Sequence, residues 1–182
     1  MSNKDNVTGS KPKIAGCIYT APIGTAIPTD ATTELAEDFK SLGYVSEDGI
    51  TESENKDSSN ILAFGGDVVL ITEGEHSYTV QFALLEYLNI DVQKVRHGDA
   101  NVSGTLETGL TIKGNANAIE NRVYVIDLLL NNAIERIVIP CGKVTETGDR
   151  TRNNSDAITT DITITGLPDD NGNKYYDYLK KA

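Results

Sequence analysis

Short segments in which apolar and polar residues alternate constrain the fold of this chain more than any other feature. His76–Leu84 places its large side chains at every second position, and Leu106–Ile112 and Ile158–Thr165 follow the same period of two. This period is typical of β-strands that bury one face. The chain is therefore expected to be rich in strands.

Two further segments predict a hairpin. Arg122–Leu130 and Ala133–Ile139 flank the pair Asn131-Asn132, and asparagine tolerates the positive φ that a two-residue turn demands. Val123–Leu130 is apolar on both faces, which indicates a central strand covered from both sides.

One helix is predicted after the strand that ends at Leu84, from apolar residues at spacings of three, four and three: Leu85, Leu88, Val92 and Val95. Arg96 and His97 complement the negative end of this helix, and Gly98 suits the position after its end. Asp30 can cap a second, shorter helix that carries Leu35 and Phe39.

Other strands are expected over Ile14–Tyr19, Ser41–Val45 and Asp67–Thr72. The last of these would form a hairpin with His76–Leu84 around Glu73-Gly74-Glu75. The chain thus has seven or so short strands, turn signals between them and no alternation of strand and helix. This pattern predicts a mainly β fold, an antiparallel β-sandwich or partly closed barrel with one flanking α-helix.

The segment Ser46–Asn60 is strongly acidic, and Ile50 is its only apolar residue. Such a segment cannot bury enough surface to fold alone. Ile61, Leu62 and Phe64 follow it directly. Because long structureless loops in compact domains are usually functional or disordered, residues 46–66 are expected to form an extended loop that orders on a partner, with Ile50, Ile61, Leu62 and Phe64 as its interface. A plain surface insertion is the alternative.

Length and charge narrow the function. The 182 residues fit one domain, and the net charge is −11. An acidic chain is a poor candidate for holding nucleic acid or anionic membranes, because both need Lys and Arg. The sequence shows no signal peptide or membrane span, so a chain made and folded in a cytoplasm is expected. Cys17 and Cys141 are expected as small core-type residues rather than as a disulfide framework.

A search for catalytic, metal or cofactor motifs finds none. His76 and His97 lie in no metal-binding or triad spacing. Asp169–Asn173 resembles a calcium loop but has its glycine at the wrong position and lacks the downstream Glu, so a solvated turn is expected. The chain is not expected to be an enzyme, and no cofactor is implied.

Several runs together resemble one family. They are Ala21–Ala31, Phe39–Gly49, Gly98–Val102 and Arg136–Pro140 followed by Lys143–Glu146. In this order they resemble the major tail proteins, or tail tube proteins, of long-tailed phages that infect Gram-positive bacteria. The resemblance covers about residues 14–168, with a flexible N-terminal arm over 1–13 and a C-terminal tail over 169–182 outside it.

The resemblance implies a virion protein that is assembled in the host cytoplasm. Its subunits would form rings, six to a ring, that stack through loops and arms into a tube whose lumen is lined by β-sheets. Other tail proteins such as the tape measure and tail terminator would be partners, and DNA would pass through without specific binding. A lumen that presents carboxylates would keep DNA mobile. The alternatives are a tube protein of a contractile tail or related injection system and a β-sandwich binding module.

Overall fold

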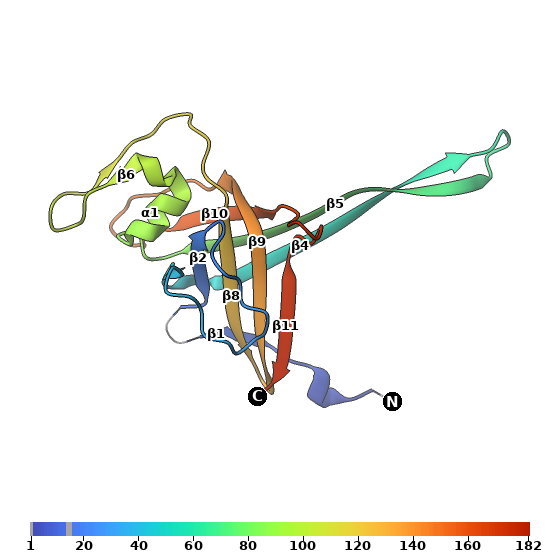
Figure 1. Cartoon of the computed structure of the whole chain (residues 1–182), viewed down its shortest axis with the longest axis horizontal. Coiled ribbons are helices and arrows are strands. Elements are labelled where there is room, and N and C mark those ends of the chain that lie inside the picture. The colour runs from blue at the N-terminus through green and yellow to red at the C-terminus, as the bar shows by residue number, and fades with distance from the viewer. Residues whose placement is uncertain (1, 14–15) are drawn as a thin grey trace.

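The computed structural model describes residues 2–13 and 16–182 of the chain, and β-strands dominate it (Figure 1). Two short 3-10 helices, Lys4–Asn6 and Asp99–Asn101, and one α-helix complete the secondary structure of this part. The strands and the helix in chain order are β1 (Ser10–Pro12), β2 (Ile18–Pro22), β3 (Lys40–Ser41), β4 (Val45–Leu62), β5 (Val68–Leu84), α1 (Ile90–His97), β6 (Val102–Ser103), β7 (Thr111–Ile112), β8 (Arg122–Leu130), β9 (Ala133–Thr147), β10 (Thr160–Gly166) and β11 (Tyr176–Lys181).

Nine strands form one antiparallel sheet in the order β3-β2-β8-β9-β10-β5-β4. β1 pairs with the end of β8 and β11 with the first half of β9, whereas β6 and β7 form a separate two-stranded sheet. β3 and β4 end the main path, so the sheet does not close into a barrel. The prediction of a mainly β, antiparallel, sandwich-like fold with one α-helix is confirmed.

The sheet folds over on itself, because β9 pairs with β8 and β11 over its first part and with β10 from Gly142 onward. The β10-β5-β4 part thereby crosses the β2-β8-β9 part (Figure 1). Between the two parts lies the larger core, which contains Tyr78, Val80 and Phe82 of β5 and Tyr124 and Ile126 of β8. Helix α1 adds Val92 and Val95.

The other face of β8 has a cover of its own. Val123 and Val125 belong to a second buried cluster with Phe39, against which Leu35 and Ile27 pack. Side chains of a strand alternate between its faces, so the two clusters together bury both faces of β8. The prediction of a central strand covered on both sides is confirmed.

The predicted helix forms, and it begins later than its apolar spacing indicated. The side chain of Asn89 accepts from the backbone N–H of Asp91 at 3.0 Å and caps α1 at its start. At the other end Gly98 adopts φ 86° and donates its N–H to the Lys94 carbonyl at 2.8 Å. Leu85 and Leu88 thus precede the helix, in the segment that joins it to β5.

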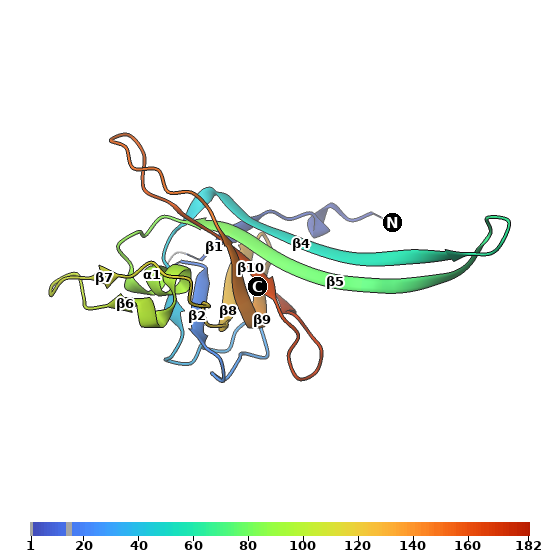
Figure 2. The ribbon, with the colours of Figure 1, turned by 90° about the horizontal axis from the view of Figure 1, so that it is seen from above.

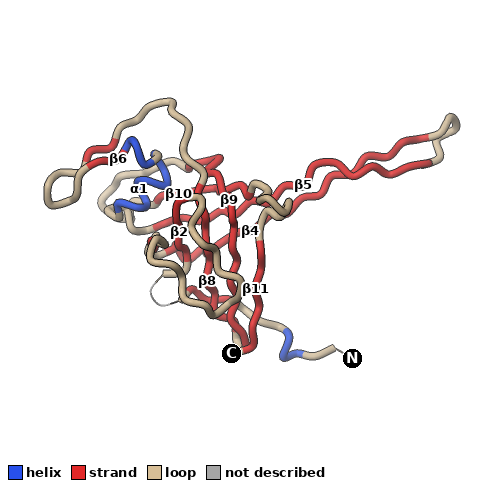
Figure 3. Tube along the Cα trace, viewed as in Figure 1, coloured by secondary structure: helices blue, strands red, loops and turns tan. Residues whose placement is uncertain are grey.

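The acidic segment predicted to be a loop is a β-strand. Residues 46–62 belong to β4, which pairs with β5 from Val45–Leu84 to Leu62–Val68, with register shifts along the way (Figure 3). The prediction was wrong because it required buried apolar side chains, whereas backbone pairing alone orders a strand. An exposed ribbon accepts charges on both faces.

The hairpin predicted around Glu73-Gly74-Glu75 is also wrong, because these residues lie inside β5, which runs unbroken from Val68 to Leu84. The turn falls instead at residues 63–67, between Leu62 and Val68. β4 shifts register between Lys56 and Ser58, opposite this glycine. The glycine there accommodates an irregularity in the ribbon rather than a turn.

Other local predictions were corrected. Asp30 caps a bend rather than a helix, since its Oδ1 accepts from the N–H groups of Thr32 and Thr33 at 2.5 and 2.7 Å. Of the region predicted as the strand Ser41–Val45, only its two ends lie in strands, Ser41 in β3 and Val45 in β4. Within Leu106–Ile112, only Thr111–Ile112 is a strand. The first predicted strand is found as β2, at Ile18–Pro22, and Ile14–Ala15 lie outside the described residues.

The hairpin of β8 and β9 forms as predicted, with Asn131-Asn132 in its turn, although neither asparagine has positive φ. The Ile158–Thr165 strand is found as β10. In the C-terminal tail, β11 pairs with β9 of the same chain. In the N-terminal arm, β1 pairs with Leu128–Leu130, and the flexibility expected of this arm stays a prediction.

Candidate assembly surface

The hairpin of β4 and β5 is the feature that stands out from the body (Figures 1 and 2). Its turn is closed by hydrogen bonds from Ala63 N to the Asp67 carbonyl at 2.8 Å and from Gly66 N to the Ala63 carbonyl at 3.0 Å. Gly65 and Gly66 have φ of 130° and 100°, conformations that glycine adopts at little cost. From residue 51 to residue 75 every side chain is exposed.

The end of this hairpin, residues 61–71 and here called the hairpin tip, is apolar. Phe64 is fully exposed, and the other large side chains of the tip are about half exposed: Ile61, Leu62, Val68, Val69, Leu70 and Ile71. Ile61 lies opposite Leu70 on one face, and Ile71 lies on the other, opposite Asn60. An exposed apolar patch on both faces of a projecting ribbon is typical of a surface that another molecule covers.

The structure brings three of the four predicted interface residues together. Ile61, Leu62 and Phe64 all lie in the hairpin tip, whereas Ile50 lies at the hairpin's base, opposite Phe82, and packs against the larger core. Ile50 is therefore part of the body in this chain.

Sequence reasoning missed the run Val68-Val69-Leu70-Ile71, which supplies the other strand of the tip. The signal was present, since this run and Ile61–Phe64 flank Gly65-Gly66 symmetrically. Two apolar runs around a Gly-Gly pair predict a hairpin with an apolar end.

Below the tip the hairpin is acidic. Asp57, Glu73 and Glu75 are exposed and lie within ion-pair distance of no basic group among the described residues. Further toward the body, Glu54 lies 3.5 Å from Lys56 Nζ and 2.8 Å from His76 Nε2. The projecting part of the hairpin therefore carries carboxylates without ion pairs.

A contact here called the tyrosine clamp fixes the hairpin to the C-terminal segment. The ring of Tyr175 stacks on Tyr78 with centroids 4.0 Å apart and planes at 16°. The Tyr175 hydroxyl donates to Glu54 Oε2 at 3.1 Å, and the Tyr78 hydroxyl donates to Glu52. Lys174 Nζ also donates to the His76 carbonyl. The projecting hairpin is thus anchored where it leaves the body.

The clamp shifts the ionisation of its members. The hydrogen bond with His76, followed by that with Tyr175, holds the pKa of Glu54 below its ordinary value. Burial, with the hydrogen bond to Glu52 second, raises the pKa of Tyr78. Burial also raises the pKa of Asp177, and the nearby negative charge of Glu52 adds to this. These shifts follow from anchoring contacts and require no catalytic role.

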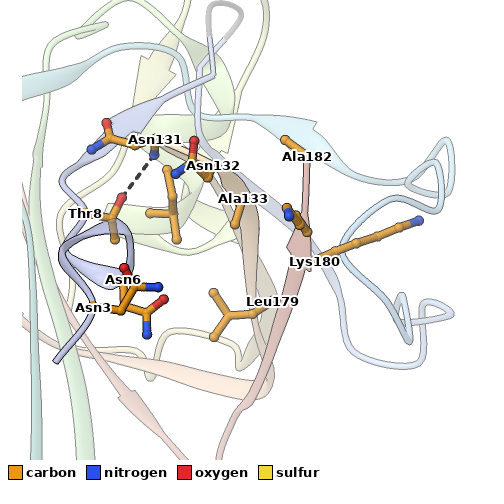
Figure 4. Close-up of a pocket in the computed structure, with 11 residues that line it drawn as sticks. Asn3, Asn6, Thr8, Asn131, Asn132, Ala133, Leu179, Lys180 and Ala182 are labelled. Atoms are coloured by element: carbon orange, nitrogen blue, oxygen red, sulfur yellow. Dashed lines mark hydrogen bonds between the residues drawn. The ribbon is translucent and has the colours of Figure 1, made fainter. Parts of the chain in front are cut away.

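A groove lies at the turn between β8 and β9, between the N-terminal arm and β11 (Figure 4). The Asn131 N–H donates to Thr8 Oγ1 at 3.0 Å and ties the arm to the β8–β9 turn. Asparagine amides, aliphatic side chains and lysines line the groove: Asn3, Asn6, Asn131, Asn132, Leu130, Leu179, Lys180 and Lys181. It holds no acid–base pair that could catalyse a reaction.

The histidines and the calcium-like run have structural roles. His76 belongs to the clamp, and His97 lies at the end of α1 with its Nε2 3.5 Å from Arg150 Nη1. Asp169 Oδ1 accepts from the N–H groups of Asn171 and Asn173 at 2.9 Å each, which is the turn expected from sequence. Within residues 2–13 and 16–182, no three His, Cys, Asp or Glu side chains are arranged to hold a metal ion.

Cys17 is buried and Cys141 half-buried, both as free thiols. No helix in the described part of the chain is long and apolar enough to cross a membrane.

Comparison with protein families identifies a match over most of the chain. The family model described as phage tail tube protein matches residues 3–182 of the chain. No curated protein matches it. The match includes the N-terminal arm and the C-terminal segment, which the resemblance seen in the sequence had left outside.

Proposed function

The chain belongs to the phage tail tube protein family, and from this premise we propose that its copies stack ring on ring, six to a ring, with each β4–β5 hairpin reaching the next ring. The family makes it a structural protein of the tail tube. The number of copies in a ring and the role of the hairpin are the proposal.

The exposed hairpin tip is the observation that carries this proposal. Burying one large aliphatic or aromatic side chain contributes roughly 1.5–3 kcal/mol, and the tip exposes seven such side chains in the isolated chain. A neighbouring copy that covers them would gain enough to offset the loss of translational freedom on association.

The test replaces apolar side chains of the tip without breaking backbone pairing. The tip variant carries Ile61→Thr, Phe64→Ser and Leu70→Thr, and the control carries Leu106→Ser, an exposed apolar residue outside the hairpin. The wild type and the control should form tubes of constant diameter by negative-stain electron microscopy, whereas the tip variant should not. All three should unfold at the same urea concentration, because the replaced side chains are exposed. Normal tubes from the tip variant would refute the role of the hairpin.

We also propose which face of the sheet lines the lumen. Val80 and Phe82 of β5 and Ile162 and Ile164 of β10 point into the core, so the residues between them point away from it. That outer face carries mainly hydroxyl and amide groups: Thr51, Ser53, Thr79, Gln81, Thr163 and Thr165. The strand registers add Asp161, Glu146 and Lys143 to it. With two carboxylates and one lysine among neutral groups, this face would neutralise few phosphates, so DNA would pass over it without being held.

This proposal leaves two carboxylates, Glu146 and Asp161, on the lumen face. Lysines introduced at Gln81 and Thr163 should leave tubes intact and make them retain DNA in a filter assay, more strongly at low salt. Arg or Lys is what binds phosphate, so tubes that assemble and still release DNA freely would place this face elsewhere. In the virion, the tape measure inside and the terminator at the end would be the further partners.

A further inference from the structure

Three arginines at one end of the molecule lack the partners that arginines have elsewhere in the chain. Arg122 pairs with Asp99, and Arg136 pairs with Asp127 at 2.6 Å. Arg96, Arg150 and Arg152 lie within 4 Å of no carboxylate of the described residues. Arg96 has only Asp161 and Asp149 as counter-charges beyond ion-pair distance, so a chain with 27 acidic and 16 basic residues leaves these three guanidinium groups without an ion pair in its described part.

These guanidinium groups are held in place by uncharged partners. Arg150 and Arg152 both lie over the ring of Tyr87, at 5.0 and 5.9 Å from its centroid, and Arg152 Nη2 donates to the Tyr87 hydroxyl at 3.2 Å. Arg150 also donates to Thr160 Oγ1 at 3.0 Å. Arg96 Nη2 donates to the Gly148 carbonyl at 2.9 Å. The buried atoms Arg96 Nη1 and Arg150 Nε have no hydrogen-bond partner.

Holding three guanidinium groups near one another costs electrostatic free energy unless an anion binds to them. Burial, with the charge of Arg96 as its next cause, lowers the pKa of Arg150. The fold nevertheless positions these groups, and the planar guanidinium is suited to carboxylates. This end of the molecule is therefore prepared for an acidic partner.

Exposed apolar side chains lie in the segment that carries Tyr87 and in the segment hydrogen-bonded to it. Leu88 directly follows Tyr87 and is 62% exposed. Leu85 lies two residues before Tyr87 and is 37% exposed, and Tyr44 is 64% exposed. The Leu85 N–H donates to the Tyr44 carbonyl at 2.9 Å, which joins the two segments. These residues form one surface, here called the arginine surface: Tyr44, Leu85, Tyr87, Leu88, Arg150 and Arg152.

The arginine surface and the hairpin tip lie at opposite ends of the molecule. The segment between β5 and α1, which carries Tyr87, lies at the α1 end, and the hairpin projects from the other end (Figures 1 and 2). Each end exposes apolar side chains, and the hairpin carboxylates Asp57, Asp67, Glu73 and Glu75 are opposite in charge to the guanidinium groups of Arg150 and Arg152. Two complementary patches at opposite ends favour a head-to-tail contact that repeats without closing.

We propose that the arginine surface receives the β4–β5 hairpin of a second copy of this chain, with Arg150 and Arg152 paired to carboxylates of that hairpin and Leu85 and Leu88 against its tip. The inference rests on the proposed stacking and assigns the surface that each hairpin meets. Charge complementarity also sets the direction of stacking, because the reverse orientation would place acidic hairpins against one another.

Charge reversal on each side tests the pairing. One variant carries Arg150→Glu and Arg152→Glu, and a milder one carries Arg152→Glu alone in case the half-buried Arg150 is needed for folding. A hairpin variant carries Asp57→Lys, Asp67→Lys and Glu73→Lys. The control is Lys113→Glu, which changes the net charge as Arg152→Glu does at an exposed position outside both surfaces.

Assembly is followed by sedimentation velocity and electron microscopy at low ionic strength, where ion pairs are screened least. Each reversed variant alone should need at least about tenfold more protein to polymerise, a factor that one or two favourable contacts can supply. An equimolar mixture of the two should polymerise again with the two variants alternating, because each hairpin then meets a surface of opposite charge. A chain with both sets reversed should polymerise again, and the control should match the wild type.

The outcomes separate this inference from the proposed function. A wild type that polymerises while all reversed variants polymerise equally well would overturn the pairing and leave tube assembly standing. Reversed variants that fail to assemble, with no recovery in the doubly reversed chain, would also overturn it. A wild type that never associates at any concentration would overturn both.

Discussion

Two four-residue runs in this molecule have nearly the same chemistry and opposite surroundings. Val123-Tyr124-Val125-Ile126 in β8 and Val68-Val69-Leu70-Ile71 in β5 are both apolar on both faces of a strand. The first is completely buried, whereas every side chain of the second is more than half exposed. The difference is that β8 has strands on both edges and a cluster on each face, whereas the far end of β5 has only β4 beside it.

This comparison indicates that a strand that is apolar on both faces needs other groups packed on each face. These covers can come from the same chain or from another molecule. For β8 the chain supplies both. For the hairpin tip it supplies neither, and on the proposed stacking the covers would be further copies of the chain. In that case the requirement would be met on folding for β8 and on assembly for the tip.

The largest effect should come from breaking the internal cover of β8. Arg136 lies at 2.6 and 2.9 Å from the two Asp127 oxygens and also donates to the Thr33 carbonyl at 2.6 Å, which holds the covering segment. Asp127→Ala would leave a buried, unpaired guanidinium and should lower the free energy of unfolding by about 3–5 kcal/mol. Urea unfolding measures this. Asp38→Ala, at an exposed position in the covering segment, should change it by less than about 0.5 kcal/mol, and equal effects would contradict the role of the pair.

A matched pair of substitutions tests the comparison directly. Ile126→Ala in β8 should lower the free energy of unfolding by about 2–5 kcal/mol, since it opens a cavity in the core. Ile71→Ala, the same change in the exposed run, should alter it by less than about 0.5 kcal/mol and should instead weaken polymerisation. Calorimetry of the monomer and sedimentation of the polymer report the two effects. A strong loss of monomer stability from Ile71→Ala would mean that the tip is covered within the chain.

The elements whose side chains alternate or bury both faces could be predicted from sequence. β8, β9, β10 and α1 were found this way because packing determines their patterns. β4 could not, since its side chains after Thr51 contact solvent and its order comes from backbone pairing with β5. An argument from side-chain burial cannot detect a charged strand whose order comes from backbone pairing with a neighbouring strand.

The candidate site was predictable in part for the same reason. Ile61, Leu62 and Phe64 attracted notice as an apolar run after an acidic one, and they do lie in the tip. Ile50 was grouped with them by proximity in sequence, yet the ribbon carries Ile61 far along β4 from it. The arginine surface was not foreseen, because Arg150 and Arg152 lie about sixty residues from Tyr87 and only the fold brings them together.

A smaller effect should follow from loosening the tyrosine clamp, the boundary between the two regions. Tyr175→Ala removes the stacking on Tyr78 and should cost about 0.5–1.5 kcal/mol beyond the lost burial. Tyr175→Phe keeps the ring and loses only the bond to Glu54, so it should cost less. Hydrogen exchange at the backbone amides of residues 76–80 should rise in the first variant and little in the second. Equal exchange in both would show that stacking does not anchor the hairpin.

The smallest effect is the pH dependence of the same clamp. The contacts of Glu54 with His76 and Tyr175 lower the pKa of its carboxyl, so their contribution is present above the ordinary pKa of 4.5 and is lost as pH falls through the lower folded value. Asp177 and Glu135, whose pKa values are raised chiefly by burial, act in the opposite sense and lose their contribution as pH rises. The pH dependence of the global free energy of unfolding therefore combines these opposite contributions. A local probe is needed to follow Glu54 alone.

The ring protons of Tyr175, stacked on Tyr78, provide that probe by NMR. They should shift toward free-tyrosine values as pH falls below about 4.5, because protonated Glu54 no longer accepts both hydrogen bonds as a carboxylate. Glu54→Gln should remove this transition, whereas Asp177→Asn should leave it. If the transition persisted in Glu54→Gln, another carboxyl would control the clamp, and Glu52, which accepts from Tyr78 on the same face of the ribbon, would be the group to replace next.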